Sequence, residues 1–490
     1  MVDIASYDSL FIGGRWTAPS GDRRFQVNSP TTGAPVGSAP EGVEADMDAA
    51  IAAARQAFDT GPWPTTPAAE RADAMARLLE LFNANAQELA ELITAEMGAP
   101  ILFSHFGQVG ATAMVLDYFV NLTRTYDFET VRPGMLGPAL VRHEGVGVCA
   151  GIVPWNVPLF IAMLKLAPAL ASGSCIILKP APETPLSGLY LAGLIEQAGI
   201  PEGVVSIVPA GREAGEHLVT APGVDKVSFT GSTAAGRRIG SLCGERLRRC
   251  TLELGGKSAA IVLDDVDLDS VVPALLPYGI MNNGQACVAQ TRILAPRSRY
   301  REMVDAFTAG VEGLKTGDPA EMDTDVGPLI AERQRDRVEG YIAKGVGEGA
   351  RLTTGGGLTQ PDGLNGWFVE PTLFVDVDNS MTIAQEEIFG PVLSLIPYDD
   401  VDDAVRIAND SDYGLSGSVW CDDVGTGIDI ARRVRTGTYT VNGFAMEWSA
   451  PFGGFKSSGV GRELGPEGLE AYLESKTINL PAGFEPELRF

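Results

Sequence analysis

The chain has 490 residues, more than a single hydrophobic core accommodates, so we expect two or three domains. Hydrophobic residues make up 45% of the composition and charged residues 20%, as in ordinary soluble globular proteins. A net charge of −26 leaves no basic surface to neutralise phosphates, so the composition argues against a nucleic-acid partner.

The cysteines and histidines show no spacing typical of a metal site. The six cysteines form no CxxC pair, and none of the three histidines stands close to a cysteine in the sequence, so we expect no metal. So few cysteines in so long a chain favour a reducing compartment. Residues 1–16 carry no recognisable signal peptide, and we therefore expect a cytoplasmic protein.

One segment, 145–164, is long enough and free enough of charge to be weighed as a membrane span. Pro154, Asn156 and Pro158 stand at its centre, where they would break a helix and leave polar groups in lipid. The same residues fit a buried strand, a turn and a buried helix, so no membrane partner is expected.

Short strands and helices are predicted over the first 143 residues. Short strand-like triplets are present at 10–12 and 25–27. Helical spacing is present in the Ala-rich stretch 45–58, in 67–97, which is rich in Ala, Leu, Glu and Arg, and in 104–123. Residues 126–143 alternate polar and apolar side chains around two Gly/Pro pairs, which predicts an extended hairpin outside the main core.

From residue 145 to 263 strand-like runs alternate with helical runs, which indicates an α/β fold with a parallel sheet. We predict strands at 146–153, 175–178, 204–208, 226–229 and 259–262, and helices at 159–170, 187–198 and 214–220. Such sheets bind nucleotides at the carboxyl ends of their strands. A second strand–helix series follows at about 268–455, with Gly-rich loops at 345–357 and 453–454, and a strand-like tail at 476–480.

Cys287 stands in a turn of small residues between two apolar runs, 271–280 and 292–294. A thiol in such a turn is open to a ligand while its backbone is held, so we interpret Cys287 as a nucleophile. Most free cysteines are small buried core residues, however, and this stretch alone does not distinguish the two interpretations.

Two glycine patterns are rejected and one is retained. The GxGxxA match at 145–150 continues as a strand instead of opening a helix, and the GGKS at 255–258 lacks the first glycine of a P-loop. At 229–232 the strand-like Phe229-Thr230 leads into Gly231-Ser232 and then a small-residue helix. That arrangement suits a pyrophosphate, although an ordinary Ser N-cap has the same pattern.

Three further polar residues follow strand-like or apolar runs. Lys179 ends one strand, where a side chain would point into a nucleotide crevice or simply be solvated. The Asn156 amide could donate to an oxyanion. Glu253 lies among apolar residues and glycines, so desolvation would raise its pKa toward that of a general base, unless it is a surface residue flanking a loop.

Together these stretches resemble the aldehyde dehydrogenase family, from residue 11 to the tail. The matching segments, in family order, are PWN at 154–156, LKP at 178–180, FTGS at 229–232, ELGGK at 253–257, GQxC at 284–287, EEIFGP at 386–391 and PFGGFKSSG at 451–459. Each is weak alone, but seven in order are specific.

The resemblance implies a role for each matched residue. Cys287 would attack the aldehyde, Asn156 and the Cys287 backbone N–H would hold the oxyanion, and Glu253 would activate the water that hydrolyses the thioester. Lys165 resembles a lysine near the oxyanion region. Lys179 and Glu387 would hold the two riboses, Ser232 the pyrophosphate, Phe389 the nicotinamide side and Trp155 the adenosine side. Phe229, Gly231, Leu254 and Gly255 complete the cofactor site.

The cofactor implied is NAD, with NADP open. Relatives that prefer NAD usually carry a carboxylate three residues after the lysine, for the adenine-ribose hydroxyls. Here Pro182 has that position, and Glu183 comes one place later. Without this carboxylate, a 2′-phosphate is repelled less strongly.

The fold implied has three parts. Residues 1–121 and 146–255 would form a Rossmann-like cofactor domain, and 256–455 the catalytic domain. Residues 122–145 and 472–490 would form an oligomerisation arm, which predicts a homodimer or homotetramer.

The substrate tunnel is expected to be lined by Tyr118, Val157, Ile161, Leu164, Ala286, Val288, Met446, Glu447 and Trp448. Most of these are apolar, which favours an aliphatic or aromatic aldehyde over a semialdehyde acid. The alternatives are a semialdehyde dehydrogenase, a CoA-acylating enzyme, a cofactor-independent thiol esterase and a binding protein that has lost the chemistry. Relatives of the acylating kind usually lack the glutamate at position 253.

Overall fold

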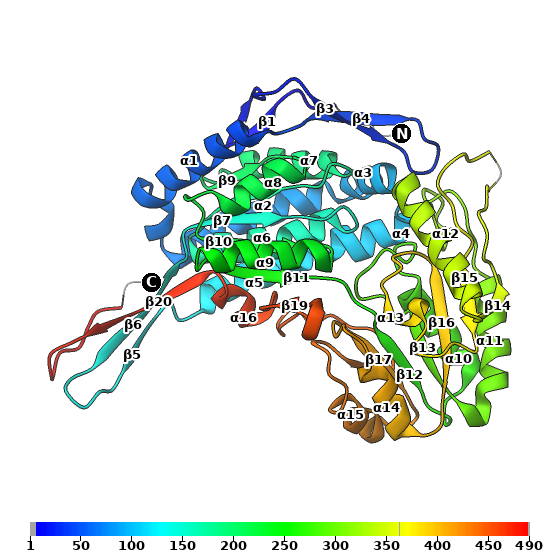
Figure 1. Ribbon diagram of the computed structural model, residues 1–490. Coiled ribbons are helices and arrows are strands. Elements are labelled where there is room, and N and C mark those ends of the chain that lie inside the picture. The colour runs from blue at the N-terminus through cyan, green and yellow to red at the C-terminus, as the bar shows by residue number, and fades with distance from the viewer. Residues whose placement is uncertain (1–5, 362, 489–490) are drawn as a thin grey trace.

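The computed structural model describes residues 6–361 and 363–488, so the ends of the predicted ranges that begin at residue 1 or reach residue 490 lie outside it. Within the described residues are two large sheets, one three-stranded sheet that projects as an arm, and a two-stranded ribbon of β3 (Arg24–Asn28) and β4 (Pro35–Pro40) (Figure 1).

The first large sheet contains four of the five strands predicted between residues 145 and 263, whereas the strand predicted at 259–262 belongs to the second large sheet. Its strands, in spatial order, are β19 (Gly459–Val460), β11 (Arg249–Glu253), β10 (Lys226–Thr230), β7 (Val148–Ile152), β8 (Cys175–Lys179), β9 (Val205–Ile207), β1 (Leu10–Ile12) and β2 (Arg15–Thr17). The five strands from β11 to β9 are parallel. Strand β7 continues through residues 148–152, so the GxGxxA match at 145–150 does not open a helix, as predicted.

Helices connect these strands. They are α6 (Pro158–Ser172), α7 (Pro185–Gln197), α8 (Arg212–Thr220) and α9 (Thr233–Glu245). From β7 to β9 the strands are added toward one edge of the sheet, and β10 and β11 are added on the other side of β7. Right-handed crossovers therefore place α6 and α7 on one face of the sheet and α8 and α9 on the other. The carboxyl ends of β7, β10 and β11 therefore meet at one edge, where Asn156, Gly231 and Glu253 follow or end them.

The N-terminal helices pack on this sheet or on the helices that cover it. They are α1 (Glu44–Thr60), η1 (Trp63–Thr65), α2 (Ala68–Ala84), α3 (Ala86–Met97), α4 (Ile101–Phe103), η2 (Ser104–Gly110) and α5 (Ala111–Thr125). The helix predicted at 104–123 is present, but its first seven residues are a π-helix.

The second large sheet begins six residues after β11. Its strands are β14 (Arg351–Thr354), β15 (Thr372–Val375), β16 (Val392–Tyr398), β13 (Arg292–Pro296), β12 (Ala259–Val262), β17 (Gly417–Trp420) and β18 (Thr440–Val441). Along β12, Ala259 and Ile261 enter one hydrophobic cluster and Ala260 and Val262 another, as the two-residue period of a sheet covered on both faces requires.

Helices of the second unit are α10 (Leu268–Gly279), η3 (Arg297–Arg299), α11 (Tyr300–Glu312), α12 (Glu332–Gly347), α13 (Thr382–Gln385), α14 (Val401–Asn409) and α15 (Val424–Ala431); η4 (Lys456–Ser458) and α16 (Gly465–Glu470) come after them. The prediction of a loop over 345–357 was wrong: α12 continues to Gly347 and β14 begins at Arg351, because buried Gly345 lets the helix pack against Ile383 and Phe374.

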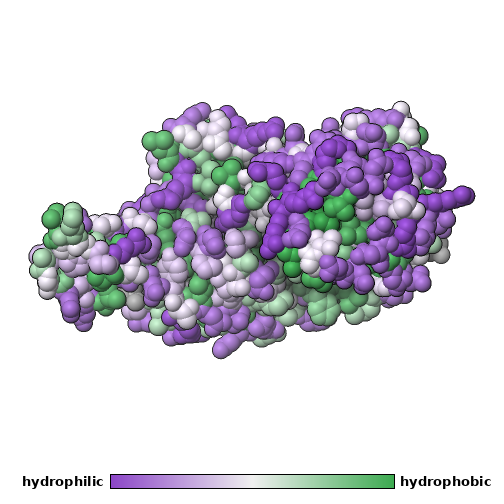
Figure 2. Space-filling view, turned by 90° about the horizontal axis from the view of Figure 1, so that it is seen from below, coloured by the Kyte–Doolittle hydropathy of each residue, from purple (hydrophilic) through white to green (hydrophobic). Residues whose placement is uncertain are grey.

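The predicted hairpin is confirmed as β5 (Glu129–Arg132) and β6 (Ala139–Gly145), and the tail strand is β20 (Leu473–Asn479). β20 pairs antiparallel with β6 along its whole length, so the two predicted parts of the arm form one sheet. The arm projects from the body, and hydrophobic residues gather at its end (Figure 2). Met135 and Leu136, between β5 and β6, are 98% and 89% exposed.

No helix among the described residues is both long and apolar enough to cross a bilayer. The segment 145–164 is divided into β7, a turn and α6, as predicted. The cytoplasmic location stays a prediction.

Candidate active site

The turn that carries Cys287 is held rigidly. Asn282, Asn283 and Gly284 follow α10 with positive φ values, and a Cβ on Gly284 would lie 2.1 Å from the Gly390 carbonyl carbon. Asn283 Nδ2 donates to the carbonyl oxygens of Gly98 and Pro328, both at 2.9 Å. These contacts fix the loop from three directions, while the Cys287 side chain borders a cavity of about 480 Å³.

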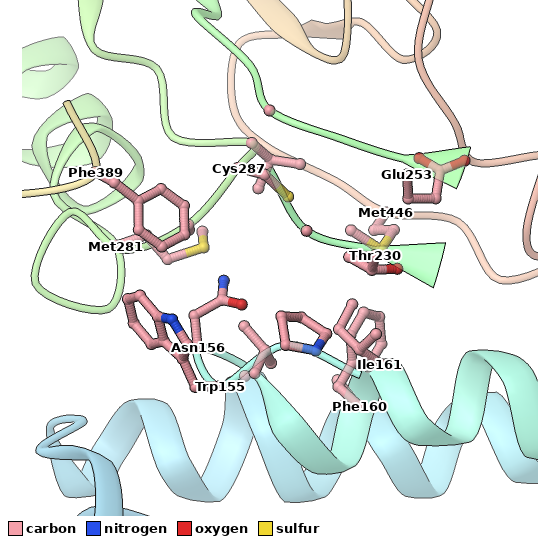
Figure 3. A pocket seen from close by; sticks show the side chains of 18 of the residues that line it. Trp155, Asn156, Phe160, Ile161, Thr230, Glu253, Met281, Cys287, Phe389 and Met446 are labelled. Atoms are coloured by element: carbon pink, nitrogen blue, oxygen red, sulfur yellow. The ribbon is translucent and has the colours of Figure 1, made fainter. Parts of the chain in front are cut away.

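Asn156 is tied directly to this turn. It follows β7 and precedes α6, and its Nδ2 donates to the Gln285 carbonyl oxygen at 2.9 Å. Asn282 Nδ2 in turn donates to the Asn156 carbonyl oxygen at 2.9 Å. The two segments are thus locked together, and the Asn156 amide and the Cys287 thiol face the same space (Figure 3).

Glu253 is the last residue of β11 and lies across the cavity from Asn156 (Figure 3). Its side chain is only 3% exposed, and neither carboxylate oxygen has a hydrogen-bond partner. Burial is the main cause that raises the pKa of Glu253 well above its ordinary value, and the charge of Glu463 adds to it. The desolvation predicted from the apolar, glycine-rich sequence is confirmed.

Burial also changes the pKa of the Cys287 thiol. Desolvation, with the nearby carboxylates of Glu387 and Glu253, raises the pKa of Cys287 to about 12. The free thiol is therefore protonated at neutral pH and needs a base to become a nucleophile.

Lys165 does not stand free in the cavity. It is fully buried in α6, and its Nζ donates to Thr230 Oγ1 and to Glu463 Oε1, both at 2.8 Å. Glu463 Oε1 also accepts from Ser228 Oγ, whereas its Oε2 has no partner. Glu463 borders the cavity, and sequence reasoning missed it.

Ser232 is the N-cap of α9, and its Oγ accepts from Ala235 N at 3.3 Å. The predicted N-cap is confirmed, and the anion site predicted at the same position stays a prediction, which the unpaired N–H groups of a helix's first turn would suit. Gly231, Ser232, Leu254 and Gly255 all border it. Phe229 does not: its ring lies against Gly231.

Glu387 and an aromatic pair form the other side of this region. Glu387 Oε1 accepts from Gly256 N at 2.9 Å, and a Cβ on Gly255 would lie 2.6 Å from its Oε2, so glycine permits the close approach. Trp155 and Phe389 meet edge to face with ring centroids 5.4 Å apart. An open helix N-terminus, a carboxylate and flat apolar walls fit a dinucleotide.

Lys179 is placed outside this cavity. It ends β8 as predicted, but its Nζ donates to the carbonyl oxygens of Ala210, at 2.7 Å, and Pro180, at 3.1 Å. Burial lowers the pKa of Lys179 to about 8. Glu183 forms an ion pair with Arg333.

The remaining wall of the cavity is apolar. Of the predicted tunnel residues, Val157, Ile161, Ala286, Val288, Met446 and Trp448 line it. Leu164 does not, because it lies nearly one helical turn further along α6 and is fully buried in the core. Tyr118 and Glu447 border a neighbouring surface depression instead. Residues that the sequence did not single out complete this wall: Phe103, Phe106, Gly107, Ala111, Met114, Phe160, Met281, Phe444 and Phe452.

No group of three or more His, Cys, Asp or Glu in residues 6–361 and 363–488 is arranged to hold a metal ion.

Three comparisons with known proteins complete the description. The family model described as "Aldehyde dehydrogenase family" matches residues 16–478. The geranial dehydrogenase of Castellaniella defragrans is 46% identical over 97% of this chain and 99% of its own.

Solved structures agree. An aldehyde dehydrogenase of Mycobacterium tuberculosis, complexed with NAD+, is 51% identical with a TM-score of 0.97, covering 99% of this chain and 100% of its own. A variant of aldehyde dehydrogenase C from Pseudomonas syringae, complexed with NAD+ and octanal, is 40% identical with a TM-score of 0.94, covering 99% of each chain. This chain therefore belongs to the aldehyde dehydrogenase family and is an oxidoreductase that acts on aldehydes.

Proposed function

We propose that this protein oxidises an apolar aldehyde to its carboxylic acid, with Cys287 as the nucleophile and Glu253 as the general base. One observation carries the proposal: the Cys287 thiol and the unpaired, buried Glu253 carboxylate border the same cavity, whose remaining wall is apolar. A thiol forms an acyl intermediate and a separate base completes its hydrolysis, so the pair supplies what this oxidation needs.

In the first step the Cys287 thiol releases its proton to solvent. Cys287 Sγ then attacks the aldehyde carbonyl carbon to give a thiohemiacetal, and Glu253 stays ionised for the second half-reaction. The oxyanion is held by the Asn156 amide and the Cys287 backbone N–H. Asn156 is suited to this role because its bond to the Gln285 carbonyl oxygen fixes the amide plane beside the nucleophile.

In the second half-reaction Glu253 removes a proton from water, which attacks the thioester carbon and releases the acid with the thiol restored. Its missing hydrogen bonds matter here, because both oxygens are available to a water molecule. The Lys165–Glu463 pair lies beside Glu253, and the charge of Glu463 helps to keep its pKa high enough for a base that works near neutral pH.

The cofactor proposed is NAD. Ser232 and the first turn of α9 would hold the pyrophosphate, Glu387 a ribose, and Trp155 and Phe389 the apolar faces. Bound nicotinamide would supply the oxidant for the thiohemiacetal. Two of the solved relatives described above contain NAD+. Because Pro182 replaces the usual carboxylate and Glu183 pairs with Arg333, NADP belongs in the same assay.

The substrate proposed is an aliphatic or aromatic aldehyde. Val157, Ile161, Met446 and Trp448 offer no charge to a second carboxylate. Arg337, which also borders the cavity, donates to the backbone oxygens of Glu387 and Ile388. The relatives named above act on or bind geranial and octanal, which are both apolar.

Formation of reduced cofactor tests the proposal. Purified protein is mixed with octanal, geranial, benzaldehyde or succinic semialdehyde, with NAD and NADP in parallel and Cys287→Ala as the control. We expect turnover with the apolar aldehydes and none with the control. Equal activity of Cys287→Ala, or a strong preference for succinic semialdehyde, would contradict it.

We also propose the three-part division predicted from the sequence, and that the arm joins subunits into a homodimer or homotetramer. β5 is an edge strand of the arm, and exposed Met135 and Leu136 extend beyond it, so a second subunit would cover both. Light scattering on Met135→Asp/Leu136→Asp should show a smaller assembly than the unchanged chain; an identical mass would contradict the role of the arm tip.

A further inference from the structure

The mouth of the cavity is built by an unusual helical turn. In η2, the N–H of Ala111 bonds to the Phe106 carbonyl oxygen, five residues back instead of four. A π-turn of this kind adds one residue to the helix and rotates the residues after it, and such turns are frequent at functional sites. Here Phe103, Phe106 and Gly107 border the cavity before the shift, and Ala111 and Met114 border it afterwards.

Local stability does not explain this turn. Gln108 is buried within it, its Nε2 meets only the Met97 sulfur, at 3.3 Å, and its Oε1 has no partner. An unpaired buried polar atom opposes folding. Phe106 is 73% exposed, so its ring contributes little to the core. The segment therefore places side chains at the mouth at the expense of its own stability.

Gly107 shows how closely the aromatic rings are fitted. A Cβ on Gly107 would lie 2.4 Å from Phe103 Cε2, so the Phe103 ring lies directly over the Gly107 backbone. With any larger residue at 107, this ring has to move. The glycine keeps the mouth open while Phe103 and Phe106 supply its apolar surface.

The mouth is suited to an apolar group that belongs to the bound substrate itself. The charged residues that border the cavity are Glu253, Arg337, Glu387 and Glu463, none of which belongs to the helical stretch at the mouth. We propose that the π-helical turn Ser104–Gly110, through Phe106, binds the distal end of an extended apolar aldehyde and so sets the preference for chain length. This inference rests on the proposed oxidation of apolar aldehydes.

The test is a series of straight-chain aldehydes from butanal to dodecanal with saturating NAD. For the unchanged protein, kcat/KM should rise by about fourfold for each methylene that becomes buried, until the chain passes the mouth. Phe106→Ala should lower kcat/KM for the long aldehydes by roughly three- to tenfold, through KM, and leave butanal unchanged. Met322→Ala, an exposed apolar residue that does not line the cavity, is the control.

A second pair of variants tests the fit of the rings. Gly107→Ala should displace Phe103 and reduce kcat/KM for long aldehydes more than for butanal. The double variant Gly107→Ala/Phe103→Ala removes the displaced ring, so it should restore part of the lost activity. Absence of this rescue, with both proteins folded, would contradict the proposed fit.

Other outcomes overturn the proposal while leaving the dehydrogenase intact. An equal effect of Phe106→Ala on butanal and dodecanal would show that the ring does not bind the distal chain. If Phe106→Ala formed a smaller assembly than the unchanged protein and kept the same chain-length dependence, Phe106 would be a subunit contact and not a substrate contact. Failure of the proposed function looks different: the unchanged protein would then oxidise no aldehyde in the series with either cofactor.

Discussion

Each of the two large sheets contains a buried ionisable side chain, and the two differ in their hydrogen-bond partners. Glu253 ends a strand of the first sheet, and Arg292 begins a strand of the second. Arg292 opens β13, is 2% exposed, and donates to the carbonyl oxygens of Lys257, Ile407 and Ala408 and to Asn379 Oδ1, each at 3.0 Å. Glu253 closes β11, is equally buried, and has no partner for either oxygen.

The difference separates a structural charge from a reactive one. The Arg292 guanidinium holds three segments of the second unit together, since every bond it makes joins β13 to a distant backbone or side chain. Glu253 gains nothing from its surroundings but faces the cavity that contains Cys287. Missing partners and an open cavity, not burial alone, therefore support the proposal that Glu253 is the general base.

Glu253→Gln should have the largest effect on activity. The amide cannot accept the proton of water, so kcat should fall by roughly 10²- to 10⁴-fold with little loss of stability. Steady-state kinetics measures this, with exposed Glu245→Gln as the control. A kcat within a fewfold of the unchanged protein would remove Glu253 from the mechanism.

Arg292→Met should have the largest effect on stability. It leaves three carbonyl oxygens and Asn379 without their donor, so the free energy of unfolding should drop by about 3–5 kcal/mol. Urea unfolding measures the change, and exposed Arg432→Met should change it by less than about 0.5 kcal/mol. A stable Arg292→Met protein without turnover would show that Arg292 serves the reaction and not the stability of the fold.

The stability of Glu253→Gln should also depend on pH in a defined way. Because the folded pKa of Glu253 is raised, the protonated form is favoured in the folded state. Its contribution is full below the ordinary glutamate pKa and is lost as the pH rises through the folded pKa. The unfolding midpoints of the two proteins should thus agree at low pH and diverge above it, with Glu253→Gln the more stable. Parallel curves at all pH values would contradict this.

The smallest expected effect is that of Glu463→Gln. Removing this charge takes away repulsion and leaves Lys165 without its partner, and both changes lower the pKa of Glu253. The acid limb of the pH profile of kcat should shift to lower pH, whereas exposed Glu467→Gln should leave it in place. A shift to higher pH would mean that Glu463 does not act through repulsion.

Much of the fold was predictable, because continuous apolar runs such as 148–152 and 175–178 leave little alternative to buried strands. β11 was missed because Arg249, Thr251 and Glu253 interrupt its pattern. The π-turn was missed as well, since a bond to the fifth residue leaves no distinct spacing in the sequence.

The site was predictable where residues act from local context and unpredictable where they act in pairs. Desolvation of Glu253 follows from its own neighbours in the sequence, and the structure confirms it. The Lys165–Glu463 bond joins residues 298 positions apart, so neither one indicates the other. Leu164 and Tyr118 were expected in the tunnel because helical spacing gives a face but not the depth at which the cavity ends.

The division of labour between Cys287 and Glu253 can be tested by trapping the intermediate. Glu253→Gln is mixed with octanal and NAD, quenched with acid within the first turnover, and mapped by peptide mass spectrometry. A separate base predicts that Cys287 carries an acyl group, with the mass of octanal less two hydrogens, and that this adduct decays slowly. An unmodified Cys287, or an adduct that hydrolyses as fast as in the unchanged protein, would contradict the assignment of Glu253 as the base.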